Sequence, residues 1–229
     1  MRAPITVEKF AVGQSVRRVE DPRLLRGLGR YSDDVDLPRQ AYAVVVRSPH
    51  AHARVRTIDT GAARAAAGVL SVLTHADLAA DGVGYLPTDR TRRRRDGSPA
   101  FATARPLLAR DRVRHVGDPV ALVIAETRER AADAAELVAV DYEPLPAVAA
   151  TADARRPDAP RVWEEAPDNV AFFWEVGQGD AVARAFERAA HMTRLDFVVS
   201  RVTAAPLEPR AAVGEYDRRT GRYTLHTGI

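Results

Sequence analysis

The chain has 229 residues, with 34 basic and 31 acidic side chains and a formal net charge of +3. It contains no cysteine, which excludes disulfides, zinc sites built on cysteine and iron–sulfur clusters ligated by this chain. The near balance of charge argues against a nucleic-acid partner. No stretch approaches the roughly 18 apolar residues of a membrane helix. Residues 1–14 lack the apolar core of a signal peptide, so we expect a cytoplasmic protein without a membrane partner.

The first two thirds of the chain predict an α+β (mixed α/β) fold. Short apolar or alternating runs indicate strands at 41–47, 53–58, 69–73, 112–116, 120–125 and 139–142. Helical segments are expected at 21–25, 60–68, 75–80 and 127–138. The succession of strand, helix and strand from 120 to 142 is the clearest pattern. Its helix has a small apolar face at helical spacing and an outward pair, Glu126 and Arg130.

The remainder of the chain alternates between loops and short elements. Glycine and proline predict a surface loop over 81–104, and a proline-rich linker is expected at 149–168. No aromatic residue interleaves with Arg92–Arg95, so this run is interpreted as a solvated loop tip rather than an anion or nucleic-acid site. The elements expected beyond the linker are a helix at 181–189 capped by Asp180, a strand at 191–202, and a hairpin of 211–216 and 222–227 whose loop ends at Gly221.

Two groups of polar residues could bind a metal, but neither completes a site. His50 and His52 could face the same side of an extended segment, with Asp59 nearby. Structural zinc needs four ligands, so we favour loop packing for the histidines. The acidic cluster Asp33–Asp36 lacks the closing glutamate of a calcium loop, which indicates a solvated turn.

Three further features could carry chemistry. Gly177–Gly179 precedes a helix that could hold a phosphate, but the third glycine of a dinucleotide fingerprint is absent. Ser48 and Ser200 lack the flanking glycines of a hydrolase nucleophile. Glu208 lies between two prolines, where a structural contact with Arg210 is favoured over a role in a site. From the residues alone we assign no catalytic, cofactor-binding or metal-ligating residue.

Several strings, in order, resemble the molybdopterin-binding large subunit of the xanthine dehydrogenase and aldehyde oxidase family. They are VGQSVRRVEDPRLLRGLGRYSDDVDLP (12–38), RSPHAHARVRTIDT (47–60), RPLLARDRVRHVGDPVALVIAET (105–127), AAELVAVDYEPLPAV (134–148), GDAVARAFERAAH (179–191) and PLEPRAAVGEYDRRTGRYTLHT (206–227). The resemblance implies an N-terminal extension (1–19), an α/β hammerhead domain (20–148), the linker (149–168) and a truncated start of the molybdopterin-binding domain (169–229). The segments SPHAHAR and LEPR match as family motifs, and we interpret both as architectural.

The resemblance also implies a function. Family members hold molybdenum pyranopterin and hydroxylate aldehydes or N-heterocycles, passing electrons to iron–sulfur clusters and flavin. The expected partners are the remainder of the molybdopterin-binding subunit and separate iron–sulfur and FAD subunits. The family's downstream pterin loops and catalytic glutamate have no counterpart here, so we expect the chain alone to be inactive and to hold no cofactor. The alternative is a free-standing hammerhead interaction module without redox chemistry.

Overall fold

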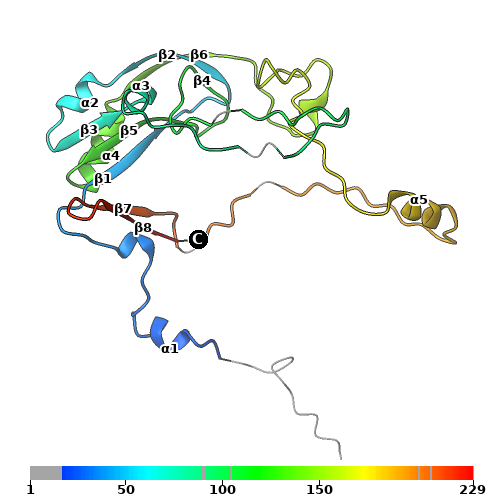
Figure 1. The fold of residues 1–229 in the computed structure, drawn as a ribbon, viewed down its shortest axis with the longest axis horizontal. Coiled ribbons are helices and arrows are strands. Elements are labelled where there is room, and N and C mark those ends of the chain that lie inside the picture. Colours follow the sequence, from blue (N-terminus) through cyan, green and yellow to red (C-terminus); the bar gives the residue numbers. More distant parts are fainter. Residues whose placement is uncertain (1–16, 89–90, 104, 201, 207, 229) are drawn as a thin grey trace, which may run out of the picture. The chain divides into compact units, whose positions relative to one another are not determined.

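The computed structural model describes residues 17–88, 91–103, 105–200, 202–206 and 208–228 (Figure 1). Most of the N-terminal extension expected over 1–19 therefore lies outside the described residues. The chain divides into two compact units, residues 39–195 and a second formed by 1–38 with 196–229. The longest helices in the described ranges have nine residues, and none of them is long and apolar enough to cross a membrane.

The first sheet of the larger unit is antiparallel, with strand order β1-β5-β3. Its central strand β5 (Pro119–Ala125) pairs with β1 (Tyr42–Arg47) on one side and β3 (Val69–Leu73) on the other. All three strands confirm the sequence prediction. The apolar, valine-rich sequence of β1 predicts a buried strand, and this was wrong: β1 is an edge strand whose residues are half-buried or exposed, because β5 occupies the sheet centre.

The second sheet places β2 (Ala53–Asp59) between β4 (Arg112–Val113) and β6 (Ala139–Pro144), again antiparallel. The strand expected over 112–116 is shorter than predicted. The N–H of Arg114 donates to the Asp118 carboxylate at 2.8 Å, so the chain turns instead of continuing the ladder. Strands β5 and β6 flank the predicted helix but belong to different sheets.

Three helices follow strands of the larger unit: α2 (Gly61–Ala65), α3 (His75–Ala80) and α4 (Arg128–Glu136). Thr127 caps α4 as predicted, since its hydroxyl accepts a hydrogen bond from the N–H of Arg130. Thr60 precedes α2 and is expected from its sequence position to cap it, but this was wrong: the Thr60 side chain makes no cap. The first N–H of the helix, that of Gly61, donates to the Asp59 carboxylate at 2.8 Å instead.

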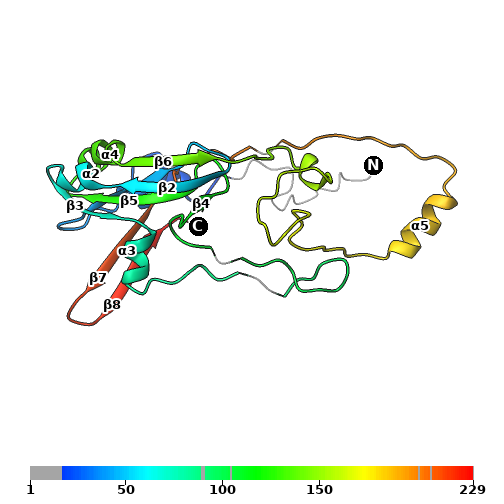
Figure 2. The same cartoon turned by 90° about the horizontal axis from the view of Figure 1, so that it is seen from above.

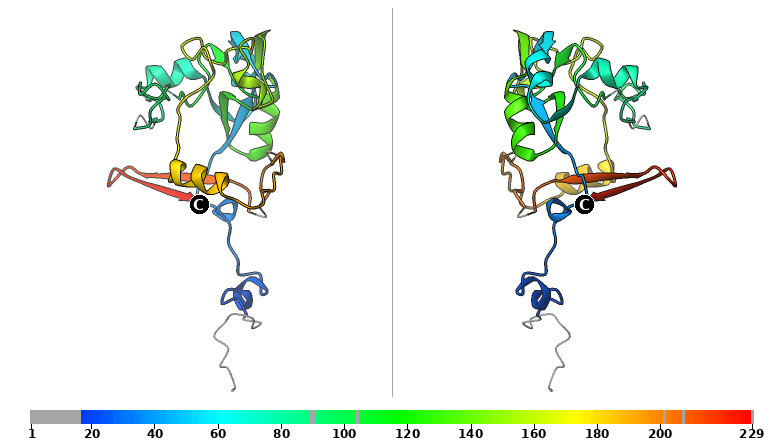
Figure 3. Two further views of the ribbon diagram at one scale, coloured as in Figure 1. Left: turned by 90° about the vertical axis from the view of Figure 1, so that its right-hand side faces the viewer. Right: turned by 90° about the vertical axis from the view of Figure 1, so that its left-hand side faces the viewer.

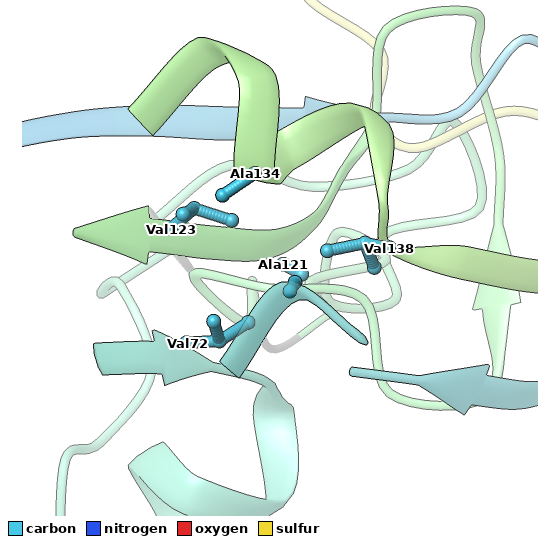
Figure 4. Packing of buried hydrophobic residues seen from close by; sticks show 6 residues of the cluster. Val72, Ala121, Val123, Ala134 and Val138 are labelled. Carbon is cyan, nitrogen blue, oxygen red and sulfur yellow. The ribbon is translucent and has the colours of Figure 1, made fainter. Parts of the chain in front are cut away.

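Helices α2 and α4 lie side by side against the first sheet (Figure 2). Ala131 and Ala134 of α4 are buried, which confirms the small apolar face. Figure 4 shows the resulting core, in which short side chains let helix and strands approach closely: Val72, Ala121, Val123, Ala134 and Val138, with Ala63. A second cluster lies at the other sheet: Ala53, Ala109, Val113 and Val120.

The two segments expected to be loops, 81–104 and 149–168, consist of irregular chain with local hydrogen bonds in their described residues. Between 81 and 111 the described residues form isolated bridges only, Leu86 with Arg105 and Arg93 with both Pro99 and Phe173. Within 149–168 lies the short turn η2 (Asp153–Arg155). The Asn169 amide donates to the carbonyls of residues 154 and 160 and accepts from the N–H of residue 162. This segment is therefore held in a compact loop.

Two expectations near the end of the larger unit were wrong. Helix α5 (Gly179–Glu187) begins two residues before the predicted start, and Asp180 lies in its first turn without capping it. The strand expected over 191–202 does not form at residues 191–200 or 202. These residues are exposed, and no described strand pairs with them. An apolar run forms a strand only where a neighbour receives its backbone hydrogen bonds.

The smaller unit contains the helical turns α1 (Asp21–Leu24) and η1 (Ser32–Asp34) and the hairpin β7 (Ala212–Asp217) and β8 (Arg222–Thr227) (Figure 3). The hairpin confirms the prediction. Gly221 has φ of +70° and donates its N–H to the Asp217 carbonyl at 2.8 Å. A residue with a side chain would be strained there.

Candidate functional site

The SPHAHAR segment packs its two histidines against different neighbours. His52 is 8% exposed, and its Nδ1 lies 2.9 Å from the Pro146 carbonyl oxygen, whereas its Nε2 is buried without a partner. The His50 ring lies 4.9 Å from the Tyr142 ring. Within the described ranges, no group of three histidine, cysteine, aspartate or glutamate side chains could hold a metal ion. The geometry of this pair is therefore that of packing residues.

Ser48 fixes the turn that carries these histidines. It is 2% exposed, and its hydroxyl accepts the N–H of His50 at 3.0 Å. Its own backbone N–H and carbonyl bond to Asp118 and Gly117. Burial raises the pKa of the Tyr142 hydroxyl, which the Ser48 side chain partly counteracts. The segment is thus a hydrogen-bonded turn with buried side chains at Ser48, His52 and Ala53, and no described group in it is arranged as a nucleophile and base.

Three of the four arginines at 92–95 are exposed, as expected of a solvated loop tip, but the run also contacts aromatic residues from a distant segment. The guanidinium of Arg92 lies 5.0 Å from the Phe172 ring centre and 5.5 Å from that of Trp174. That of Arg95 lies 4.1 Å from the Phe173 ring. The sequence of the run alone does not show these pairs, because their aromatic partners lie about 80 residues further along the chain. The one sequence feature that could have indicated them is the aromatic triplet at 172–174.

Arg94, in the same run, forms an ion pair with Asp168. This hydrogen bond is the main reason why the pKa of the Asp168 carboxyl lies below its usual value. Together with the aromatic contacts, the pair attaches the loop after α3 to residues 168–174. The run therefore stabilises an irregular part of the larger unit.

A second arginine–aromatic contact joins β4 to the segment that follows η2. The Arg114 guanidinium lies 3.4 Å from the centre of the Trp163 ring, and its Nε donates to the Val162 carbonyl at 3.2 Å. Burial lowers the pKa of Arg114 from its ordinary value. Arg112, on β4 itself, bonds to Glu164 at 2.8 Å. The alternation of Arg112 and Arg114 in the sequence could have indicated a polar face with a partner.

The remaining candidates do not converge on one site. Gly177 has φ of +129°, and the helix after Gly179 carries no buried side chain. Ser200 is exposed. The predicted contact between Glu208 and Arg210 was wrong, since the Glu208 carboxylate accepts hydrogen bonds from Ser32 instead.

The acidic cluster forms a turn in the smaller unit. Asp33 and Asp34 are exposed members of η1, and the Asp34 carboxylate accepts the N–H of Tyr31 at 2.8 Å. This arrangement agrees with the interpretation as a solvated turn.

Two family models match the chain in succession. The model described as the α/β hammerhead domain of aldehyde oxidase and xanthine dehydrogenase matches residues 26–146, just over half of the chain. The chain belongs to the aldehyde oxidase and xanthine dehydrogenase family. The model of the molybdopterin cofactor-binding domain matches residues 162–229. Both matches confirm the resemblance inferred from the sequence.

Curated relatives agree with the family. The chain is 38% identical to the carbon monoxide dehydrogenase large chain of Afipia carboxidovorans, with 93% of this chain and 27% of the relative covered. It is 39% identical to the nicotine 6-hydroxylase large subunit of Paenarthrobacter nicotinovorans, with 97% and 26% covered. The chain thus spans about a quarter of the length of these two relatives.

Solved structures of the family share the fold. The structure of quinoline 2-oxidoreductase from Pseudomonas putida 86 aligns with a TM-score of 0.76 and 37% identity, covering 94% of this chain and 26% of that one. A carbon monoxide dehydrogenase structure aligns with a TM-score of 0.75. The mixed helix-and-strand architecture predicted from the sequence is therefore the hammerhead architecture of this family.

The described residues after 166 form no enclosed surface, and one cleft of the larger unit is small. A cleft beside α3, lined by His75, Leu78 and Tyr85 among others, encloses only about 40 Å³. Ligand pockets usually measure roughly 300–1,000 Å³. None of the residues described between 167 and 228 is buried, so this part of the chain offers no enclosed wall for a cofactor. We therefore assign no catalytic step to these residues.

Proposed function

We propose that the chain forms part of the large subunit of a molybdenum hydroxylase, to which it contributes the hammerhead domain as a structural and assembly unit. The proposed division is an extension at 1–19, the hammerhead at 20–148, a linker at 149–168 and the start of the molybdopterin-binding domain at 169–229. The order of the two family matches along the chain supports this division.

The single observation that carries the proposal is the contrast in burial between the two matched regions. The hammerhead region has two apolar cores, whereas no residue described between 167 and 228 is buried. Large apolar side chains are instead exposed there: Leu195, Phe197, Val198, Val199 and Val202. Removing apolar surface from water stabilises a folded or assembled state by about 25 cal/mol per Å². We infer that further molybdopterin-binding polypeptide covers this surface.

The same proposal assigns the chemistry to the assembled subunit. Molybdenum pyranopterin, when bound there, would supply hydroxylation of an aldehyde or N-heterocycle and release electrons to iron–sulfur and FAD subunits. This chain has no cysteine to ligate iron–sulfur clusters, so electron transfer would depend on those partners. We propose that the chain alone is inactive, and a cytoplasmic location remains a prediction.

The test is co-expression in a host that makes molybdenum cofactor. The second polypeptide is the part of the Afipia carbon monoxide dehydrogenase large chain that lies beyond the matched quarter. We expect the two to copurify and hydrogen exchange at 195–202 to slow by at least about tenfold. Val198→Asp should abolish the association, and Val19→Asp, at a similarly exposed position, should not. Failure to copurify, or equal effects of both variants, would contradict the proposal.

A further inference from the structure

Glu208 forms its hydrogen bonds within the smaller unit, to a residue far away in the sequence. Its Oε1 accepts the backbone N–H of Ser32 at 3.0 Å and the Ser32 hydroxyl at 3.2 Å. Both donors belong to the first residue of η1, and Glu208 precedes the hairpin strand β7 by four residues. Figure 3 shows the blue turn η1 next to the base of the hairpin, and η1 contacts β7.

The end of the hairpin lies against the same carboxylate. A Cβ built on Gly228 would come within 3.0 Å of Glu208 Oε1 and 3.2 Å of its carboxyl carbon. The Thr227 hydroxyl oxygen lies 3.1 Å from the carbonyl oxygens of both Ala211 and Gly228, so its one proton can be donated to either. The carboxylate is thus enclosed by η1 on one side and by the residue after β8 on the other.

The two sides make different demands on position 208. The N–H and hydroxyl of Ser32 need an acceptor, and hydrogen bonds to an ionised acceptor are stronger than those between neutral groups. At Gly228 a Cβ would lie in tight contact with the Glu208 carboxylate, which would have to shift by a few tenths of an ångström to admit it. A glutamate side chain is long enough to reach Ser32 and flexible enough to lie beside Gly228. A shorter residue would leave the Ser32 N–H without this partner.

We propose that Glu208 is a positioning residue whose carboxylate latches the segment 31–34 to the hairpin β7–β8 and fixes the chain at Gly228. The LEPR segment then owes its architectural role to this one side chain. The inference goes beyond the proposed function, since it concerns the fold of the smaller unit and requires no cofactor.

The test is hydrogen exchange in the full chain, followed by mass spectrometry of peptides covering 28–35, 222–228 and 119–125. Glu208→Ala should raise exchange at 31–35 by about tenfold, although the change lies far away in the sequence. Glu208→Gln keeps a neutral acceptor and should give a rise of about threefold. Glu215→Ala, which removes an exposed carboxylate from β7, is the matched control and should leave 31–35 unchanged.

The reciprocal variant is Ser32→Pro, which removes both donors. Tyr31 has φ of −92° and ψ of 165°, a conformation that accepts a following proline at the start of a turn. Exchange at 222–228 should then rise. The proposal would be wrong if Glu208→Ala left exchange at 31–35 unchanged. It would also be wrong if Glu215→Ala raised exchange at 31–35 by the same factor. A rise that spreads to β5 in both Glu208 variants would also overturn it. Because these readouts use the chain alone and need no second polypeptide, this inference and the proposed function fail separately.

Discussion

Strands β5 and β8 show how the same kind of element differs in the two regions of the molecule. Both are six or seven residues long and pair antiparallel. In β5 four of the seven residues are buried, because strands lie on both sides and α4 packs against it. In β8 no residue is buried. Hydrogen-bonded pairing alone therefore does not produce a core; a strand also needs a covering layer.

Helices α4 and α5 repeat the comparison. Each has nine residues. Helix α4 has a side-chain cap and two buried alanines, and α5 has neither. Yet α5 has larger apolar residues four apart on one face, Val182 and Phe186, which are 52% and 59% exposed. The face most suited to packing is thus the one left uncovered, in agreement with the proposed covering polypeptide.

The largest expected effect is that of a charge placed in the β5 core. Val123 has no exposed surface, so Val123→Asp buries a carboxylate without a partner. The free energy of unfolding should fall by at least about 4 kcal/mol. Val198→Asp, at a residue that is 92% exposed, should change it by less than about 0.5 kcal/mol. Urea unfolding followed by circular dichroism measures both changes. Similar losses of unfolding free energy in the two variants would contradict the difference in packing between the two regions.

A second test compares a buried with an exposed histidine. His52→Ala removes a buried ring and its contact with the Pro146 carbonyl, which should cost about 2 kcal/mol of unfolding free energy. His52→Asn retains an amide donor and should recover part of that loss. His191→Ala, in the exposed segment after α5, should cost less than about 0.5 kcal/mol. If His52→Ala left the free energy of unfolding unchanged, the SPHAHAR segment would not contribute to the stability of the hammerhead.

The junction between the regions depends on Arg114 and Trp163. Arg114→Ala should cost about 1.5 kcal/mol, because its guanidinium is partly buried against the ring. Arg92→Ala, whose aromatic contacts are exposed, should cost about 0.5 kcal/mol. In a Trp174→Phe background the fluorescence reports Trp163 alone, since the chain has two tryptophans. Its emission should shift to longer wavelength in Arg114→Ala and remain unchanged in Arg92→Ala.

Local patterns predicted the hammerhead strands because each pattern had a physical cause that the fold retained. Ala121 and Val123 of β5 and Ala134 of α4 lie in the same core, in agreement with the apolar spacing of both elements. The hairpin β7–β8 follows from its turn, where Gly221 adopts positive φ. Periodicity and turn chemistry act over a few residues, so a single sequence reveals them.

Contacts between distant residues could not be predicted in this way. The partners of Arg92 and Arg95 lie at 172–174, and that of Glu208 is Ser32. No periodicity connects such positions, and the nearest charge, Arg210, was wrongly preferred for Glu208. The strand expected over 191–202 failed for the related reason that a strand depends on its neighbour.

The smallest expected effect is pH-dependent and tests the capping interaction at the start of α3. The Asp77 carboxylate accepts the hydroxyl and the N–H of Thr74, both at 2.7 Å, and bonds to Arg64. The Thr74 hydroxyl is the main cause of the lowered pKa of Asp77, whose ordinary value is 3.8. A carboxylate with a lowered pKa stabilises the folded state above the unfolded value and loses that contribution as the pH falls through the folded value.

Asp77→Asn should therefore lower the unfolding free energy by about 1 kcal/mol at pH 7 and have almost no effect near pH 2. Urea unfolding of both proteins from pH 7 to pH 2 measures this difference, which should start to shrink as the pH falls below 3.8 and be lost as it passes through the lower pKa of the folded state. Thr74→Val removes the hydroxyl that contributes most, so the pH dependence caused by Asp77 should shrink in that background. A constant difference across the whole range would mean that Asp77 acts through helix propensity, because only an ionised carboxylate makes the difference depend on protons.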